Sequence, residues 1–377
     1  MKKALKAMLL LATLLVFCSC SYAHEINERA IVKTIGIDFY RNTVCITAVY
    51  LVPTNDEEKS KDIVIAGTSN SIETAFEKLR KQIASNIYFG HCTQVILGIT
   101  ASKMNADTLA DTLENLSEIR KNAIVAVASG SAEELLNVRH ESGLSVTETI
   151  DRLIRKNKDR GNIAVALSDI TAQKEGFLLP VIAAKINKSK DVLFSAVDTV
   201  SDEEKKMETP SSVVMEGELL FSEDNSAYRL SGELMDSVLF LAHRSNGALL
   251  EIGEEKNGFM CEISEVGVQF AASTAKKLDG QNITVNCKFK VSPFEQESFF
   301  TDVEILKMCE EKMEKNLSHA LQFVLYNRRC DIFGINWLLK INGDAAKVEQ
   351  RLRRFGYYPV NITVDSEAEM RDSGKSD

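Results

Sequence analysis

Alternating apolar and polar positions predict β-strands in several parts of the chain. A strand-like run at 31–37, turn residues at 38–42 and alternation over 44–50 predict a β-hairpin. The clearest strand covers 283–291, where every second residue is apolar, so one face should be buried and the other wet. Residues 260–270 fit an antiparallel neighbour of this strand, with a break in the alternation near Glu265 that suggests a β-bulge.

Helical spacing of apolar residues separates these strands in the first half of the chain. It predicts helices over 71–85 and 105–119, and a further helix that begins at 132. Short apolar strands are expected at 95–99, 123–128 and 176–186. Strands that alternate with helices are typical of an α/β domain.

The second half combines a hairpin, a sheet and a long helix. A second hairpin is expected from 213–221 and 228–234, after a charged loop or linker at 198–212. One apolar stripe marks a helix over 301–326, and Glu310, Glu311, Glu314 and Lys315 are expected to face away from it. An amphipathic helix can bind a partner, although packing on its own sheet is commoner. After a loop at 331–336, a helix at 345–355 and a strand at 358–364 complete the pattern.

The predicted fold class is therefore α/β (α+β), with three mixed α/β domains. The last of these should have an antiparallel sheet packed on the long helix. We place an N-terminal domain at 20–190, a small middle domain at 191–246, a C-terminal domain at 247–366 and a disordered tail at 367–377.

The amino terminus has the pattern of an export signal. Three lysines precede an apolar run over 7–17, which is shorter than the roughly 20 residues that a membrane-spanning helix needs. Cys20 follows the small residue Ser19, which favours a lipoprotein signal at 1–19 and lipidation of Cys20. The alternatives are the neighbouring Cys18, which follows the bulky Phe17, and ordinary secretion with cleavage near Ala23. Two acyl chains on one cysteine would give a durable membrane anchor.

Charge narrows the range of partners. The formal net charge is −9, and residues 1–19 contain three lysines and no acid, so the remainder carries about −12. An acidic body is a poor nucleic-acid binder. It is also repelled by anionic headgroups, so we expect it to meet membrane proteins and not to lie on the bilayer.

The residues offer little that is typical of catalysis. The five histidines are scattered without metal-ligand spacing, and no phosphate loop, dinucleotide fingerprint or nucleophile elbow is present. The adjacent pairs Glu310–Glu311 and Glu133–Glu134 fit solvated helix surface, and His91 and Cys92, as neighbours on a strand, should face opposite ways. We therefore predict a protein that is not an enzyme, without a metal or cofactor. The six cysteines outside the signal are expected to be buried thiols, with one disulfide possible.

After Cys20, the chain carries Glu25, Ile26 and Asn27, and then the strand residues Gly36, Ile37 and Asp38. This pattern resembles the start of the Ger(x)C family, the lipoprotein C subunits of spore germinant receptors, although Ser21 and Tyr22 depart from the usual Trp-Asp pair. The resemblance continues in FGHCTQVILG (89–98), SEIRKNAIVAVASGSAEELL (117–136), MEGELLFSEDNSAYRLSGEL (215–234) and CDIFGINWLLK (330–340). In the last segment Asp331 and Gly334 fit the family, whereas Asn336 replaces a glycine.

The resemblance implies a receptor subunit on the outer face of the inner spore membrane. It would be anchored by lipid and would scaffold and couple the A and B membrane subunits, with the small-molecule germinant bound by another subunit. Glu25, Asn27, Gly36, Asp38, Asp331 and Gly334 are then candidates for partner contacts or for family-specific structure. Two rival functions remain open. One is a lipid-anchored solute-binding protein of a transporter, which needs a cleft between two similar lobes, and the other is an envelope hydrolase.

Overall fold

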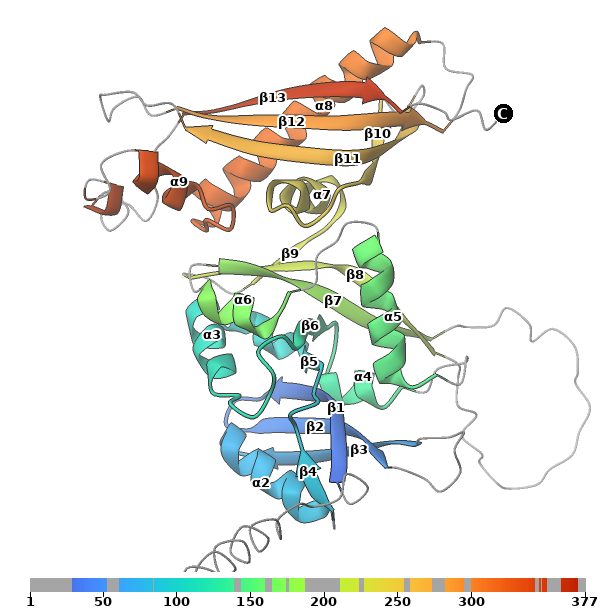
Figure 1. The fold of residues 1–377 in the computed structure, drawn as a ribbon, viewed down its shortest axis with the longest axis vertical. Helices are drawn as coiled ribbons and strands as arrows, with labels where there is room; N and C mark the ends of the chain where they lie inside the picture. Colours follow the sequence, from blue (N-terminus) through green and yellow to red (C-terminus); the bar gives the residue numbers. More distant parts are fainter. Residues whose placement is uncertain are drawn as a thin grey trace, which may run out of the picture.

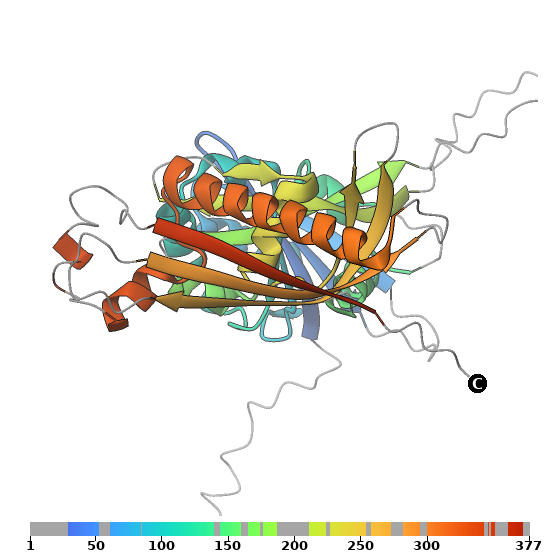
Figure 2. The same ribbon diagram turned by 90° about the horizontal axis from the view of Figure 1, so that it is seen from above.

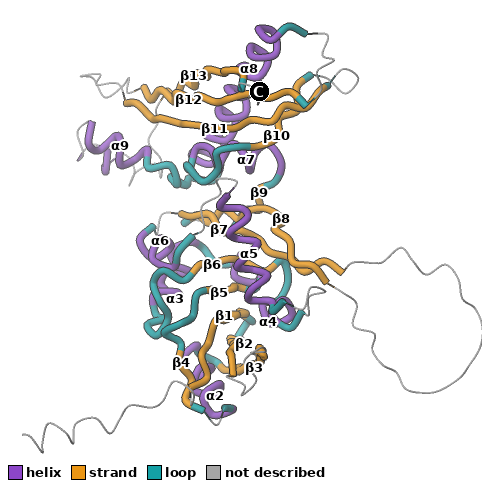
Figure 3. The backbone as a smooth tube through the Cα atoms, turned by 45° about the vertical axis from the view of Figure 1, so that its right-hand side comes forward, coloured by secondary structure: helices purple, strands orange, loops and turns teal. Residues whose placement is uncertain are grey.

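Two β-sheets of unequal size organise the chain, which is mixed α/β as the sequence predicts (Figure 1). The computed structural model describes residues 29–52, 61–83, 85–138, 144–159, 165–173, 176–186, 211–223, 227–253, 258–272, 282–294, 300–342, 346, 348–350 and 361–371. The second sheet lies beyond the β8–β9 side of the first (Figure 3). Arg29, the first described residue, pairs with β4 at the opposite end of the molecule.

The first sheet has the order β3-β2-β1-β5-β6-β7-β8-β9, and β4 pairs with the start of β1. Its described strands are β1 (Arg29–Phe39), β2 (Val44–Val52), β3 (Lys61–Ser69), β4 (Asn86–Tyr88), β5 (Gln94–Leu97), β6 (Ile124–Ala128), β7 (Gly176–Ile186), β8 (Ser211–Ser222) and β9 (Tyr228–Leu230). The central neighbours β1, β5, β6 and β7 are parallel, and antiparallel strands flank them on both sides. Both predicted hairpins, β1–β2 and β8–β9, are present.

Helices cover both faces of the first sheet. They are α2 (Ile72–Gln82), the 3-10 helix η3 (Ile99–Lys103), α3 (Ala106–Glu114), α4 (Ala132–Leu136), α5 (Val146–Asp159) and α6 (Leu167–Ala172). Apolar side chains of α2, α3 and α6 share one core, and those of α4 and α5 share another on the opposite face. The central strands are therefore buried on both sides, which is why their sequences are almost continuously apolar.

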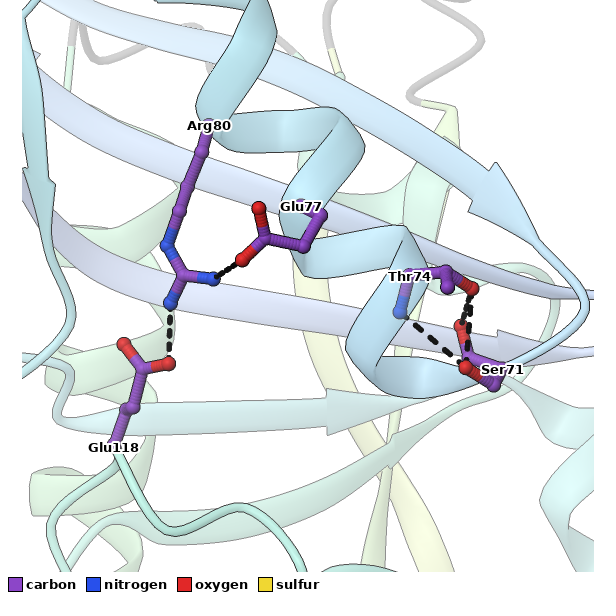
Figure 4. A network of polar contacts seen from close by, with 5 residues as sticks. All are labelled: Ser71, Thr74, Glu77, Arg80 and Glu118. Carbon is purple, nitrogen blue, oxygen red and sulfur yellow. Dashed lines mark hydrogen bonds and ion pairs between the residues drawn. The ribbon is translucent and has the colours of Figure 1, made fainter.

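Polar side chains begin three of these helices where the sequence predicts. Ser71 accepts a hydrogen bond from the backbone N of Thr74 at 3.3 Å, as Figure 4 shows. Asn105 accepts one from the N of Thr108 at 2.9 Å, and Ser131 accepts one from the N of Glu134 at 3.3 Å. Each bond satisfies a donor that the first helical turn leaves without a partner in the helix.

The second sheet has the order β10-β11-β12-β13 and carries the long helix on one face. Its elements are β10 (Ala248–Ile252), β11 (Phe259–Ala272), β12 (Asn282–Pro293) and β13 (Asn361–Met370), with the helices α7 (Gly232–Leu241), α8 (Asp302–Leu321), the π-helix η5 (Gln322–Asn327) and α9 (Ile335–Asn342). Figure 2 shows α8 running along the sheet beside β13. The predicted bulge is present, because the β11–β12 register shifts between Ser264 and Gly267 and Glu265 has φ +52°.

The sheet is antiparallel over β10–β12, as predicted, but β13 is parallel to β12. The connection between them contains α8 and α9, and a helical crossover of this kind brings the next strand back in the same direction. The expectation of a disordered tail from 367 is wrong for 367–370. These residues continue β13 and pair with 288–291 of β12, because Ala368 and Met370 continue the inward-facing alternation that begins at Ile362. Residues 372–377 lie outside the described part of the chain.

Several other predictions need correction. Helices α5 and α6 were not predicted, and the expected loop at 331–336 already contains the start of α9. The predicted helix at 105–119 ends at 114, and most of the predicted helix at 345–355 lies outside the described residues. The domain limits stay a prediction. Within 191–246, however, β8 and β9 belong to the first sheet, whereas the apolar residues of α7 join the core of the second.

The acidic residues of α8 also differ from expectation. Glu310 accepts a hydrogen bond from the backbone N of Ala368 at 2.9 Å, and Glu314 accepts one from the N of Ser366 at 3.2 Å. These two side chains therefore lie along β13, the edge strand of the sheet, and do not face away from it. They satisfy backbone donors that an edge strand would otherwise expose.

Candidate functional site

The candidate positions from the sequence fall into three groups. Cys20, Glu25 and Asn27 lie outside the described residues, so their places stay predictions. Gly36 and Asp38 lie on β1 in the first sheet. Asp331 and Gly334 precede α9, next to the second sheet. The structure therefore does not gather the described candidates into one site.

Asp38 holds the amino terminus of α4. Its side chain is 2% exposed, and its Oδ1 accepts a hydrogen bond from the backbone N of Ala132 at 2.9 Å. Its Oδ2 accepts bonds from the N of Glu133 at 3.0 Å and from Ser131 Oγ at 3.2 Å. A carboxylate at this end of a helix satisfies free N–H groups and interacts favourably with the helix dipole. Asp38 thus ties the end of β1 to α4.

Two glycines let this helix and this carboxylate come close to the sheet. A Cβ atom on Gly36 would lie 2.9 Å from Leu136 Cδ1 and 3.0 Å from Ala132 Cβ, both on α4. A Cβ on Gly98, at the end of β5, would lie 1.8 Å from Asp38 Oδ1. The Gly-Ile-Asp sequence at 36–38 therefore holds α4 against the sheet. Gly36 leaves room for the helix, and Asp38 accepts hydrogen bonds from its amino terminus.

Asp331 has the same role at α9. Its Oδ1 accepts hydrogen bonds from the backbone N of Phe333 at 3.3 Å and of Ile335 at 3.0 Å, and its Oδ2 accepts one from the N of Asn336 at 2.5 Å. Burial raises the pKa of the Asp331 carboxyl, while these backbone donors act in the opposite direction. Gly334 has φ +76°, a conformation that favours glycine, so the tight turn around the carboxylate needs it.

The residue before this turn contacts the first sheet. The Cys330 thiol donates a hydrogen bond to the carbonyl oxygen of Phe221, on β8, at 3.5 Å. A Cβ on Gly176, at the start of β7, would lie 2.1 Å from Cys330 Sγ. The segment CDIFG at 330–334 therefore sits at the junction between the two sheets. Sequence reasoning missed the part that Gly176 plays, because its contact comes from a residue far along the chain.

A buried ion pair lies at the same junction. Arg244, after α7, donates from Nη1 to Glu218 Oε2 at 3.4 Å and to the Leu178 carbonyl oxygen at 3.2 Å. Burial raises the pKa of Glu218, and the charge of Arg244 acts to lower it. Around the pair, Leu178, Leu220 and Leu230 of the first sheet share a core with α7, α8 and the second sheet. In the sequence, this contact is indicated only by Glu218, a charged residue within the mostly apolar strand predicted at 213–221.

Aromatic and cationic side chains close one side of the junction. The ring of Tyr228, on β9, lies 4.8 Å from that of Phe323, on η5, between centroids. The Arg328 guanidinium lies 4.1 Å from the centre of the Tyr228 ring, which is a favourable cation–π distance. Hydrogen bonds, an ion pair and ring contacts thus connect the two sheets.

A surface groove of about 240 Å³ lies between α2 and the segment at 115–119. Apolar side chains of Phe76 and Leu116 line it together with Glu73 and Glu77. Arg80 pairs with Glu77 at 2.5 Å and with Glu118, as Figure 4 shows, so this guanidinium is already occupied. Within the groove, Glu77 and Glu118 therefore share one cation, Arg80, which comes from the protein itself.

Residues considered for catalysis are separated in the described structure. Cys92 is fully buried and donates to the Gln94 carbonyl oxygen at 3.2 Å, and burial raises the pKa of its thiol to about 12. His91 is exposed and contacts Arg120 and the ring of Tyr88. Among the described residues, no three His, Cys, Asp or Glu side chains are grouped closely enough to hold a metal ion. No helix in the described ranges is long and apolar enough to cross a membrane.

Comparisons with known proteins found a similarity in sequence and a similarity in fold. Residues 22–183 match the family described as spore germination protein N-terminal domain. The chain belongs to the Ger(x)C family of spore germination proteins. This Ger(x)C family member also resembles the crystal structure of the GerBC protein, with a TM-score of 0.50 and 11% identity over 89% of this chain and 96% of that one. At that identity the likeness shows the fold alone. No curated protein matches this chain in sequence.

Family membership sets the broad function of this Ger(x)C protein. It is a member of the germinant receptor C-subunit family, which implies a place in a receptor complex and association with a membrane. The family is one of receptor subunits and is not known as a family of enzymes. The motif residues Gly36, Asp38, Asp331 and Gly334 position helices within the fold, and a part for them in partner contacts stays a prediction.

Proposed function

We propose that this chain is a lipid-anchored C subunit of a spore nutrient germinant receptor, which scaffolds and couples the A and B membrane subunits. The observation that carries the proposal is the family match over 22–183, which begins two residues after Cys20. The lipid on Cys20 would place the chain on the outer face of the inner spore membrane. The germinant itself would bind another subunit.

The position of Arg29 supports a defined orientation. Eight residues separate Cys20 from Arg29, and an extended chain covers at most about 3.6 Å per residue, so β1 would start within roughly 30 Å of the lipid. Arg29 pairs with Asn86 of β4 at the end of the first sheet that is remote from the second sheet (Figures 1 and 3). The first sheet would then lie near the bilayer and the second would project away from it.

The junction between the sheets supports a coupling role. The Arg244–Glu218 pair, the Cys330 contact with β8 and the shared apolar core join the two sheets at several points. A force or displacement at one sheet is therefore transmitted to the other through packed side chains and not through a free linker. A partner that contacts both sheets would therefore bind them as a single unit.

The test uses Cys20→Ala, with Cys18→Ala as the matched control from the same signal segment. In spores that carry Cys20→Ala as the single copy, we expect loss of the acyl modification by mass spectrometry, loss of the protein from the inner membrane fraction and slower nutrient germination. Cys18→Ala should retain all three properties. A full germinant response in Cys20→Ala spores would contradict the anchoring role.

The rival solute-binding function has less support. Such a protein needs a ligand cleft between two similar lobes, whereas the two described sheets differ in strand number and in topology. Thermal-shift measurements of the purified chain against amino acids and sugars separate the two functions. We expect no nutrient to raise the melting temperature, and a saturable rise with one nutrient would favour the rival.

A further inference from the structure

The groove between α2 and residues 115–119 has an apolar floor that the core holds in place. The floor is made by Phe76, Leu116 and Ile119, which are buried and belong to the core under the first sheet. The ring of Phe76 also packs edge-on against that of Phe89, with the two centroids 4.9 Å apart. Because these side chains are fixed by packing within the protein, the groove does not need a partner in order to form.

The rim of the groove carries more negative than positive charge. Glu73 and Glu77 come from α2 and Glu118 comes from the opposite side, and all three are exposed. Arg80 is the one cation among the described residues that line the groove, and it pairs with both Glu77 and Glu118 (Figure 4). Three carboxylates and one guanidinium give the rim a formal charge of −2. A cationic ligand is therefore favoured over an anionic one.

Size and charge select among the possible occupants. The groove has a volume of about 240 Å³, which is below the roughly 300–1,000 Å³ of most small-molecule sites. A nutrient carboxylate would also need a cation, and Arg80 is already shared by two glutamates. The negative charge repels anionic lipid headgroups and a second copy of this acidic chain. A protein segment with an apolar side chain next to a lysine or arginine fits both the floor and the rim.

The groove lies at the end of the molecule where the lipid would hold it. The helix α2 and the strand β4 lie together at the end of the first sheet that is remote from the second sheet (Figures 1 and 3). Arg29, the first described residue after Cys20, pairs with β4 at this same end. A membrane-spanning protein beside the anchor would meet this end of the chain first.

We propose that the groove binds a segment of a membrane-spanning receptor subunit in which an apolar side chain stands next to a lysine or arginine. The apolar side chain covers the floor of the groove, and the cation lies against Glu73 and Glu77 on the rim. The inference rests on the proposed function, because the lipid on Cys20 is what brings the groove close to the membrane. It adds the surface through which the chain contacts its partner.

The first test changes the charge of the rim. Glu73→Lys places a cation there and leaves both partners of Arg80 in place. Asp107→Lys is the matched control, since Asp107 is also an exposed acid in the first turn of a helix, α3, and is not among the residues that line the groove. Each full-length variant is captured by an affinity tag from detergent-extracted spore membranes, and the membrane-spanning subunits that co-purify are quantified by mass spectrometry.

We expect Glu73→Lys to lower the recovery of these subunits about tenfold, because like charges then face each other. Asp107→Lys should recover them at the level of the parent chain. Equal recovery with the two variants would overturn the proposal.

The second test places a photo-reactive amino acid, p-benzoylphenylalanine, at position 117 of the full-length chain in spores. Ser117 is exposed and lines the groove, and the same substitution at position 107 is the control. We expect illumination to link position 117, and not position 107, to a subunit that co-purifies with the parent chain. The linked peptide should contain a lysine or arginine next to an apolar residue.

The outcomes separate this inference from the proposed function. If the parent chain recovers membrane-spanning subunits but position 117 links to none of them, to lipid or to a second copy of this chain, the groove is not the contact surface and the proposed function stands. If the parent chain itself recovers no membrane-spanning subunit, both are wrong.

Discussion

Arg244 and Glu218 form a buried ion pair across the junction of the two sheets, with Nη1 and Oε2 3.4 Å apart. Their side chains are 14% and 4% exposed. Glu218 comes from β8 in the first sheet, whereas Arg244 follows α7, whose apolar residues belong to the core of the second. The Glu218 charge is therefore compensated by Arg244 at a place where water has little access.

Removal of one partner should destabilise the junction strongly. Arg244→Met leaves the Glu218 charge buried without its cation, and breaking a buried pair in this way costs about 3–5 kcal/mol. The double variant Arg244→Met/Glu218→Met should recover a large part of this loss, because no charge is left buried. Urea unfolding followed by circular dichroism measures both. If the single and double variants have the same free energy of unfolding, the buried Glu218 charge is not what destabilises Arg244→Met.

Asp38 should contribute to stability through α4. Asp38→Ala leaves three donors at the start of this helix without their acceptor, and we expect a loss of about 2–4 kcal/mol in the free energy of unfolding. Asp38→Asn keeps one acceptor oxygen and should lose less. Hydrogen exchange should show the change at 131–136. Unchanged exchange there in Asp38→Ala would show that the cap is unimportant.

Glu310 and Glu314 should protect the edge of the second sheet. The double variant Glu310→Ala/Glu314→Ala frees backbone donors of β13, which then become available to another chain. We expect more self-association of the purified chain, measured by analytical ultracentrifugation. Glu311→Ala is the matched control, since Glu311 is exposed on the same helix and pairs with Lys307 at 3.9 Å. Equal association in both variants would argue against edge protection.

The carboxyl group of Asp236, on α7, should make the free energy of unfolding depend on pH. Burial, and to a smaller degree the charge of Glu233, raises the pKa of Asp236 from 3.8 to about 6. Between these values the unfolded chain loses this proton before the folded chain does, so the contribution of Asp236 to stability is complete below pH 3.8 and decreases as the pH rises to about 6. Asp236→Asn should remove this part of the slope.

The measurement is the difference in unfolding free energy between parent and variant from pH 3.5 to 7. Glu233→Gln serves as the control, because Glu233 is an exposed neighbour that pairs with Lys312 at 2.8 Å. It should reduce the slope only slightly. An unchanged slope in Asp236→Asn would place the pH dependence on other buried carboxyl groups.

Local patterns in the sequence predicted most of the strands and the longer helices. Apolar residues alternate over the predicted strand at 44–50, apolar periodicity marks the helices that follow Ser71, Asn105 and Ser131, and the α8 stripe is continuous, so each could be recognised from its own residues. The bulge at Glu265 could also be recognised locally, because the alternation of apolar and polar residues breaks there. These features depend on neighbours within one element.

Other features depend on residues far apart in the chain. Glu310 and Glu314 looked like solvated surface because the strand that they contact, β13, follows about fifty residues later. The continuation of β13 through 367–370 looked like a polar tail, since only Ala368 and Met370 are apolar there. Gly36 and Asp38 stood out by family resemblance, but their shared role at α4 follows from sheet topology, which brings 131–136 against β1.

The proposed function makes this chain a subunit attached to membrane-spanning receptor partners. The decisive experiment is affinity capture of the tagged full-length chain from detergent-extracted spore membranes, with identification of co-purifying proteins by mass spectrometry. We expect multi-spanning A and B subunits to be recovered with the parent chain and to be reduced or lost with Cys20→Ala. Recovery of the chain by itself from both preparations, at equal yield and with correct folding, would contradict it.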